Sequence, residues 1–144
     1  MNFKKNICLK KLNTFGINVK CKLYCKIQSK EEIITVLNSK EYNNNTHLIL
    51  SGGSNILFVK DYEGLIIKND IKGKEITKET HKSTTVRVGA GENWHQFVLW
   101  SIKNNLSGLE NMSLIPGNVG AAPIQNIGAY GAEVKDFIIS VEGI

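Results

Sequence analysis

The sequence predicts an α+β fold made of two small lobes, and three observations lead to this prediction. The chain has 144 residues, of which 42% are hydrophobic and 22% charged, a composition typical of a globular domain. Short segments that alternate between apolar and polar residues, as strands do, occur in both halves, and each half also has one amphipathic helical segment. A glycine-rich turn directly follows a strand-like segment in each half.

The first half reads as a βαβ-like unit. Residues 23–28 alternate as a short strand, and residues 29–40 follow as a helix. Ser29 is placed to cap this helix, and Glu32 stands three residues later, where a capping box has its acidic member. The expected buried stripe of the helix consists of Ile33, Ile34 and Leu37.

The βαβ-like unit continues with further strands. Residues 47–55 predict a buried strand that runs into a glycine turn. Residues 55–59 and 64–69 continue as strands, and residues 60–64 form the turn between them. The unit therefore ends around a glycine loop.

The second half also predicts a strand, a glycine turn and a helix. Residues 84–91 alternate as a strand and end in a turn containing Gly89 and Gly91. Residues 92–105 predict a helix, capped by Glu92 or Asn93. Residues 136–144 read as a closing strand. The helix places four apolar residues on one face: Trp94, Phe97, Val98 and Ile102.

Charge and cysteine content exclude several classes of function. The net charge of +5 comes almost entirely from scattered lysines, because Arg87 is the only arginine, and this pattern disfavours a nucleic-acid partner. It leaves a general attraction to anionic small molecules. Three cysteines without a second pair or a matching histidine predict reduced thiols and no metal site: Cys8, Cys21 and Cys25.

No sequence feature indicates a membrane or an export signal. No apolar run approaches the roughly 20 residues that cross a bilayer. The first residues carry lysines but lack a continuous apolar segment. We therefore expect a cytoplasmic protein without a membrane partner. His95, alone on its predicted helix, is expected to be a packed or surface residue rather than a catalyst.

The turn at residues 51–55 is a candidate anion site. Glycines at the end of a strand let successive backbone N–H groups point at one spot, and such a nest binds phosphate oxygens. Neither the Walker nor the Rossmann pattern is present, because no Gly-Lys-Ser/Thr follows and strand-like residues come next. A plain hairpin turn is the alternative.

Residues 114–133, "LIPGNVGAAPIQNIGAYGAE", are the least ordinary stretch of the chain. They hold both prolines and show no apolar period of a strand or a helix. Small residues allow a backbone to lie against a flat ligand, and the amides of Gln125 and Asn126 could meet the polar edge of a heterocycle. Together with a phosphate nest, this predicts a dinucleotide carrying a flat ring. The alternative is a tightly packed Gly/Ala loop between domains.

Four segments then carry a resemblance to a known family. They are "NTFGI", "LSGGSNILF", "VGAGENWHQFV" and "GLENMSLIPGNVGAAPIQNIGAYGAE". In this order and at these spacings they resemble the FAD-binding half of the UDP-N-acetylenolpyruvoylglucosamine reductases, and "PIQNIGAYG" resembles their type I branch. The resemblance implies a two-lobed FAD-binding domain of the vanillyl-alcohol-oxidase type, with FAD in the cleft between the lobes.

The resemblance also implies which residues bind FAD. The pyrophosphate loop corresponds to Ser51, Gly52, Gly53, Ser54 and Asn55. The segment passing along the flavin and its diphosphate corresponds to Pro116, Gly117, Gly120, Ala121 and Ala122. The positions near the ring system are Gln125, Asn126, Gly128 and Tyr130. Relatives often have serine or glycine at positions 121 and 122, so backbone donors are expected to replace a hydroxyl contact here.

The domain boundaries follow from the same resemblance. The FAD-binding domain is expected at residues 9–144, after an N-terminal extension at 1–8. Lobe one is expected at about 17–70, and lobe two, incomplete, at about 71–144. The family's arginine, serine and glutamate of catalysis fall beyond residue 144, as does the substrate-binding domain. We therefore assign no catalytic residue to this chain and expect it to be inactive alone.

The implied activity of the whole protein is a reduction in peptidoglycan synthesis. FAD is bound non-covalently, NADPH is the co-substrate, and UDP-N-acetylglucosamine enolpyruvate becomes UDP-N-acetylmuramate. Such an activity serves cell wall biogenesis, cell shape and cell division. Two alternatives remain: a non-catalytic flavin-binding module that acts alone, and another FAD oxidase or dehydrogenase of the same superfamily. The oligomeric state stays open.

Overall fold

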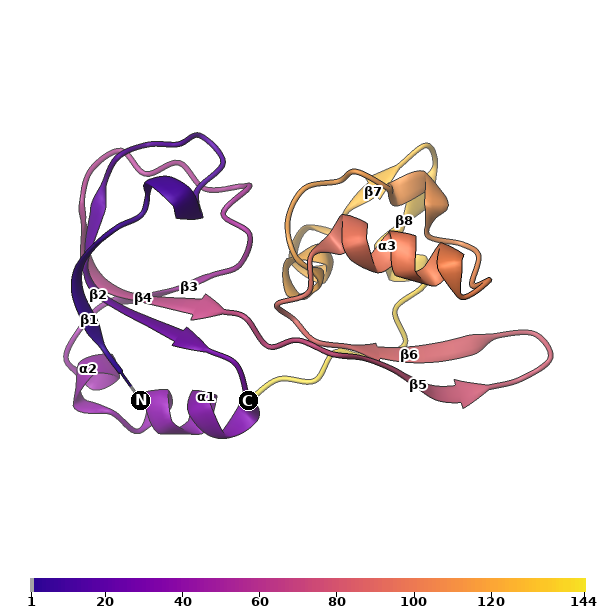
Figure 1. Cartoon of the computed structure of the whole chain (residues 1–144), viewed down its shortest axis with the longest axis horizontal. Coiled ribbons are helices and arrows are strands. Elements are labelled where there is room, and N and C mark those ends of the chain that lie inside the picture. Colours follow the sequence, from indigo (N-terminus) through magenta and orange to yellow (C-terminus); the bar gives the residue numbers. More distant parts are fainter. Residues whose placement is uncertain (1) are drawn as a thin grey trace. The chain divides into compact units, whose positions relative to one another are not determined.

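The computed structural model describes residues 2–144 and divides into two compact units. The first unit extends through Ile71 and includes Ile144, and the second comprises Lys72–Gly143. Both units combine helices and strands (Figure 1). The predicted α+β class is thus confirmed.

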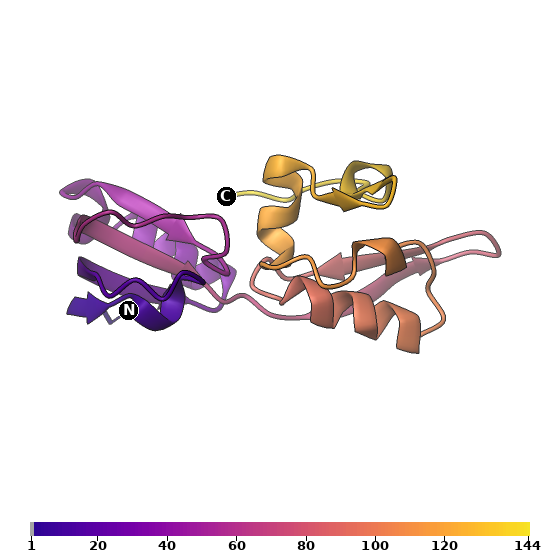
Figure 2. The same cartoon turned by 90° about the horizontal axis from the view of Figure 1, so that it is seen from above.

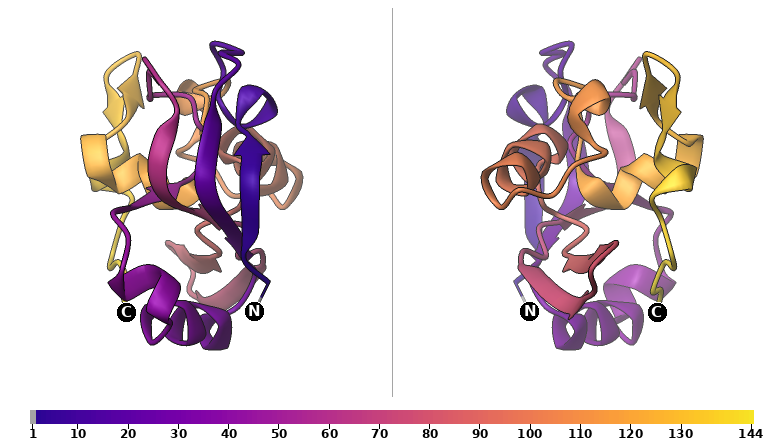
Figure 3. Two further views of the ribbon diagram at one scale, coloured as in Figure 1. Left: turned by 90° about the vertical axis from the view of Figure 1, so that its left-hand side faces the viewer. Right: turned by 90° about the vertical axis from the view of Figure 1, so that its right-hand side faces the viewer.

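A four-stranded sheet forms the frame of the first unit. Its strands are β1 (Lys4–Cys8), β2 (Lys20–Ile27), β3 (His47–Leu50) and β4 (Tyr62–Asn69). The spatial order is β1-β2-β4-β3, in which β1 is antiparallel to β2 while β2 and β3 both run parallel to β4. The strands lie side by side in the left panel of Figure 3. The expected N-terminal extension therefore contains an edge strand of this sheet.

The central strand β4 is buried on both of its faces. Ile66 points into one core, and Leu65 and Ile67 point into the other. Parallel strands covered on both faces read as continuous apolar runs, which explains the sequence "GLII". The first core contains Leu9, Val19, Cys21, Leu50, Phe58 and Ile66. The second contains Leu23, Cys25, Ile27, Val36, Leu65 and Ile67.

Two helices connect β2 to β3. Helix α1 (Lys30–Leu37) begins as expected, because the Ser29 side chain accepts a hydrogen bond from the Glu32 N–H. Helix α2 (Lys40–Asn43) follows and is likewise capped by a serine. The predicted buried stripe is partly wrong, since Ile34 is exposed and Val36 is the fully buried residue of α1.

Two strand predictions in the first unit need correction. Strand β3 forms at the expected place, but it lies at the sheet edge and leaves Ile49 exposed. Residues 55–59 form no strand. Phe58 fills the first core from this segment, while Leu57 and Val59 point outward. Alternation was present there, but the segment has no partner strand.

The second unit is built on a two-stranded antiparallel ribbon. Its strands are β5 (Lys74–Glu79) and β6 (Thr84–Val88). The sequence pattern predicts β6, but β5 gives no such signal, because "KEITKE" is polar and only partly alternating. Figure 2 shows α3 lying along this ribbon.

Helix α3 (Trp94–Lys103) provides most of the second unit's core. Asn93 is its N-cap, as one of the two predicted options, and its side chain accepts from the Gln96 N–H. The buried residues of α3 are Trp94, Phe97, Val98 and Ser101, whereas Ile102 is exposed and was wrongly placed on the buried face. Val86 and Val88 of β6 pack against this core.

The remainder of the second unit is made of short elements. These are the 3₁₀ helices η2 (Glu110–Met112), η3 (Val119–Gln125) and η4 (Val134–Asp136), and the paired strands β7 (Gly128–Ala129) and β8 (Ala132–Glu133). Residues 114–133 thus form neither an ordinary strand nor an ordinary helix, as predicted. The expected closing strand at 136–144 is absent from the structure, and Ile139 and Val141 are exposed.

All three cysteines lie in the first unit and are free thiols. Cys8 is exposed, while Cys21 and Cys25 are buried. Burial raises the pKa of the Cys25 thiol to about 11, so the thiol is protonated and unreactive at neutral pH. Among residues 2–144, no helix has the length and apolar character needed to cross a bilayer, and no cluster of side chains suits a metal ion.

Candidate functional site

The glycine turn at residues 51–55 is held by a second loop of the first unit. The backbone N–H of Thr14 donates to the Gly53 carbonyl over 3.0 Å, and the Thr14 hydroxyl donates to the same oxygen over 3.3 Å. Asn13 is buried and organises the second loop, donating to the carbonyls of Leu9 and Ile17 while accepting from the Ile17 N–H. The turn is therefore a two-loop structure rather than a simple hairpin.

Gly53 cannot be replaced in this arrangement. Its φ of +68° lies in the left-handed region, and a Cβ at this position would stand 2.0 Å from the Leu12 carbonyl oxygen. Two backbones approach each other here more closely than any side chain allows. The glycine requirement thus has a packing cause as well as a conformational one.

Several polar groups of the turn have no partner within the described part of the chain. The backbone N–H groups of Gly52, Gly53 and Ser54 donate no hydrogen bond there. The Ser51 hydroxyl oxygen is buried and also lacks a partner among residues 2–144. Lys68 of β4 contacts the Ser51 carbonyl and places a positive charge beside the turn. Unpaired donors next to a cation form a setting that suits an anionic group.

The second candidate segment, residues 114–133, is held at its start. Residues 112–120 are bound by residues 90–95. Several hydrogen bonds that end on backbone carbonyl oxygens join the two segments. Gly120 N–H donates to Ala90 O over 2.9 Å and Val119 N–H to Glu92 O over 2.8 Å. Trp94 donates from its backbone N–H to Gly117 O over 3.0 Å and from Nε1 to Met112 O over 2.8 Å. Residues 90–95, within the "VGAGENWH" motif, therefore act as a template that fixes the path of this segment.

Small residues let the template and the segment come together. A Cβ at Gly120 would lie 2.6 Å from the Ala90 methyl group and 3.0 Å from the Ala90 carbonyl oxygen. Ala122 is buried in the core, whereas Ala121 is half-buried. Asn118 adds a side-chain bond to Gly91 O over 3.0 Å. The Gly/Ala composition therefore has a packing role, which the sequence analysis had kept as an alternative.

The end of the segment forms a tight hairpin. Strands β7 and β8 are joined by Tyr130 and Gly131, whose φ angles of +52° and +84° are both positive, as in a type I′ turn. Tyrosine rarely adopts a positive φ. The side chain of Tyr130 is also 91% exposed. Asn126 is also left-handed and accepts from the Lys135 N–H. Gln125 and Gly128 are exposed.

Two carboxylates of the second unit are tied to lysines. The ion pair with Lys74 and a hydrogen bond from the Gly73 N–H hold the pKa of the Glu92 carboxyl below its ordinary value. Glu92 thereby fixes the start of β5 to the glycine turn before α3. The hydrogen bond from Lys135 similarly lowers the pKa of Glu133, which is more exposed. The Glu92 side chain is only 12% exposed but is kept ionised by Lys74, and Glu133 is more open, so neither has the apolar setting that raises the pKa of a general acid.

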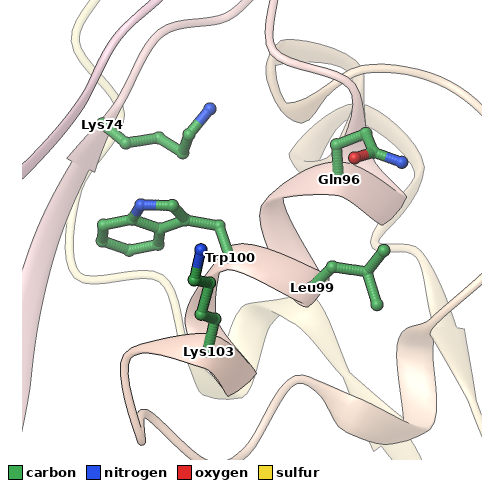
Figure 4. Close-up of a pocket in the computed structure, with 5 residues that line it drawn as sticks. All are labelled: Lys74, Gln96, Leu99, Trp100 and Lys103. Carbon is green, nitrogen blue, oxygen red and sulfur yellow. The ribbon is translucent and has the colours of Figure 1, made fainter.

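A separate open pocket of about 310 Å³ lies on the second unit, between α3 and β5. Figure 4 shows Trp100 and Lys103 projecting from α3 and Lys74 from β5. Gln96 and Leu99 complete its lining. None of the predicted site residues contributes to this pocket, and Lys74 is already paired with Glu92.

The structure groups the predicted residues by unit. Ser51 to Asn55 lie in one turn of the first unit, and Pro116 to Tyr130 lie along one continuous segment of the second. Sequence reasoning missed the supporting roles of Asn13, Thr14 and His95. These three residues lie in the segments "NTFGI" and "VGAGENWHQFV", which carry the family resemblance. That resemblance was the one sequence signal that could have pointed to them.

Comparison with known proteins agrees with this arrangement. The family model described as "FAD binding domain" matches residues 21–144. The chain therefore belongs to the FAD binding domain family.

The similar curated proteins are UDP-N-acetylenolpyruvoylglucosamine reductases. The protein from Flavobacterium johnsoniae is 54% identical over 144 residues, which is 100% of this chain and 42% of the relative. The protein from Amoebophilus asiaticus is 46% identical with the same two coverages. The chain thus spans about two fifths of the length of these relatives, and the resemblance stated from the motifs is confirmed.

A solved structure shows the same fold. The crystal structure of UDP-N-acetylenolpyruvylglucosamine reductase from Thermus caldophilus matches with a TM-score of 0.72 over 94% of this chain and 46% of that one. Its sequence identity to this chain is 24%. The prediction of a two-lobed FAD-binding domain is thereby confirmed at the level of the fold.

Proposed function

We propose that this chain binds FAD non-covalently as the cofactor-binding part of an NADPH-dependent reductase. The substrate of the whole protein is UDP-N-acetylglucosamine enolpyruvate and its product is UDP-N-acetylmuramate, a step of peptidoglycan synthesis. The proposal rests on the family, on the named relatives and on the residues of the two candidate segments.

The buried, unpartnered hydroxyl of Ser51 is the observation that carries the FAD proposal. Leaving such a group without a hydrogen bond costs about 1–3 kcal/mol in a folded protein. This cost is offset when an acceptor oxygen binds at the turn. The N–H groups of Gly52, Gly53 and Ser54 would then donate to the same diphosphate, and Lys68 beside the turn would favour its charge.

The second unit supplies residues suited to the flat part of FAD. Pro116, Gly117 and Gly120 would present backbone without bulky side chains. The backbone donors expected at positions 121 and 122 are not available, because the Ala121 N–H donates to the Asn118 carbonyl over 3.0 Å and Ala122 is buried. The exposed Gln125, Gly128 and Tyr130, with half-buried Asn126, would contact the ring system. Bound FAD would supply hydride transfer. The residues of this chain bind and orient the cofactor, and we assign no proton transfer to any of them.

The Ser51→Ala variant tests the phosphate turn. We expect FAD to bind roughly fivefold or more weakly, because a hydrogen bond to a charged group is lost. The flavin-free variant should be as stable as the parent chain or more stable by up to about 1 kcal/mol, since the removed hydroxyl had no partner. Affinity is measured by FAD titration and stability by urea unfolding.

Ser101→Ala is the matched control for this experiment. Its hydroxyl is also buried but donates to the Val98 carbonyl over 2.8 Å, so its loss should lower stability and leave FAD affinity unchanged. Unaltered FAD affinity in Ser51→Ala would contradict the phosphate assignment.

Acid precipitation should release all bound FAD into the supernatant, because the binding is non-covalent.

The isolated chain should bind FAD without forming UDP-N-acetylmuramate. Hydride transfer to the enolpyruvyl group requires a fixed acceptor, a proton donor and stabilisation of developing charge. The resemblance assigns the last two to an arginine, a serine and a glutamate that match no residue among these 144. Product is followed by mass spectrometry, and its formation by this chain would contradict the assignment.

A further inference from the structure

We propose that His95 is a positioning residue whose neutral imidazole holds Leu114 in a left-handed conformation and thereby fixes the start of the FAD-contacting segment. The inference rests on the proposed FAD site but concerns a residue outside it. His95 Nδ1 lies 3.2 Å from the Leu114 N–H nitrogen and 3.0 Å from the Ser113 hydroxyl oxygen.

His95 adds a last contact to the template. Trp94 already binds this segment at Met112 and Gly117, on either side of Leu114. Between those two points, the bond from the Leu114 N–H to His95 joins the segment to α3 by a side chain. The residue that this bond holds lies two positions before Pro116, where the proposed FAD contacts begin.

Leu114 needs such a restraint. Its φ of +62° lies in the left-handed region, which costs a residue with a Cβ about 1–2 kcal/mol. Its side chain is 76% exposed, so packing of the side chain contributes little to fixing this conformation. A hydrogen bond on the backbone N–H is therefore the contact available to hold the residue.

The protonation state of His95 decides whether this bond exists. Nδ1 accepts the Leu114 N–H only when it carries no proton, which places the imidazole hydrogen on Nε2. A protonated Nδ1 would donate to the Ser113 hydroxyl instead and would repel the Leu114 N–H.

The charged groups around His95 are otherwise engaged or distant. Glu92, just before α3, is paired with Lys74, and Glu110 of η2 accepts from the Gly108 N–H. Lys103 lies eight residues further along α3, about 12 Å along the helix axis. The bond from Leu114 is thus the contact that His95 Nδ1 makes to the backbone of this segment.

Three variants of the full 144-residue chain test the proposal by FAD titration at neutral pH. His95→Ala should bind FAD roughly fivefold more weakly, the loss expected for one hydrogen bond. His95→Asn can offer its side-chain oxygen near the position of Nδ1 and should stay close to the parent. Leu114→Gly added to His95→Ala should restore most of the affinity, because glycine adopts positive φ without cost.

Two outcomes of these titrations would overturn the proposal. One is an unchanged affinity in His95→Ala. The other is a loss that Leu114→Gly does not repair, since a merely structural defect of the helix would not be cured at Leu114.

Nuclear magnetic resonance separates this proposal from the proposed function. In the flavin-free parent chain, the Leu114 amide should exchange slowly, and it should exchange rapidly in His95→Ala. If the parent binds no FAD, the proposed function fails, and this measurement still decides the role of His95. A Leu114 amide that exchanges rapidly, or stays protected in His95→Ala, would overturn the proposal.

Discussion

The two units of this chain achieve order in different ways. The first unit has a four-stranded sheet with a hydrophobic core on each face, and its candidate turn lies at the end of an edge strand. The second has a two-stranded ribbon, one core and a long segment whose strands, β7 and β8, are two residues each. Specific backbone hydrogen bonds to the template 90–95 take the place of a sheet there.

This difference shows where sequence patterns carry information. Alternation and apolar runs describe a layered sheet, because each residue faces one of two cores. A segment held by individual hydrogen bonds and left-handed residues has no such period. The close contacts of the two candidate regions also differ in kind: a backbone carbonyl blocks Gly53, whereas a methyl group is nearest to Gly120.

The largest expected effect concerns Gly53. Gly53→Ala should lower the free energy of unfolding by about 3 kcal/mol or more, because its Cβ would stand 2.0 Å from the Leu12 carbonyl oxygen. Gly16→Ala is the matched control, with φ of +65° but no atom within 4 Å of the added Cβ, and should cost about 1–2 kcal/mol. Urea unfolding followed by circular dichroism compares them, and equal costs would contradict the close-contact argument.

In the second unit the corresponding change should be repairable. Gly120→Ala is expected to cost about 1–3 kcal/mol, because the new methyl group meets that of Ala90 at 2.6 Å. Ala90→Gly in the same chain should recover part of this loss, because it removes the methyl group while the Cα and carbonyl oxygen of residue 90 stay 3.0 Å from the new Cβ. No second substitution removes the carbonyl that blocks Gly53. The double variant is measured in the same unfolding assay, and a failure to recover stability would show that the backbone itself is the obstacle.

Removing the N-cap side chain of one helix in each unit should cost less stability than the glycine changes do. Ser29→Ala should cost about 0.5–1 kcal/mol, since its hydroxyl accepts a single N–H bond from Glu32. Asn93→Ala should cost about 1–2 kcal/mol, because the side chain caps α3 and also reaches the Gly117 carbonyl. Asn93→Asp keeps the capping oxygen and should recover part of the loss. Equal costs at both caps would argue against the second contact.

The smallest expected effect is the pH dependence contributed by Glu92. Because its partners lower the pKa in the folded state, its contribution is present above the ordinary value of 4.5 and is lost as the pH falls through the lowered folded value. Glu92→Gln should remove about 1 kcal/mol or less at pH 7 and flatten the stability profile below pH 5. Glu142→Gln, which breaks the exposed pair with Arg87, is the control and should leave the profile unchanged.

Local signals predicted the elements that depend on local chemistry. The Ser29 cap, the Asn93 cap and the apolar strand β4 were all read correctly, because neighbours in sequence determine them. The Glu32 carboxylate accepts from the Gln28 N–H instead of the Ser29 N–H, so the full capping box does not form. Residues 55–59 and 136–144 had strand-like alternation but form no strand, since a strand also needs a partner for its backbone groups. The polar strand β5 was missed because its stabilisation comes from pairing with β6.

The candidate site shows the same limit. The glycine turn at 51–55 was recognised from its composition, and the Asn93 cap from its place before a helix, whereas the alternative cap Glu92 is wrong. The contact between Thr14 and Gly53 joins residues 39 apart in the sequence, so no periodic pattern encodes it. The bond between His95 and Leu114 is likewise non-local, and the left-handed φ of a leucine has no sequence signature.

The distribution of cysteine and tryptophan between the units has a practical consequence. All three thiols belong to the first unit, whereas Trp94 and Trp100 are the chain's two indoles and belong to the second. The rate of thiol labelling at the buried Cys21 and Cys25 therefore reports the opening of the first unit. Indole fluorescence reports the unfolding of the second unit. The wild-type chain thus carries an independent unfolding reporter in each half, without an introduced probe.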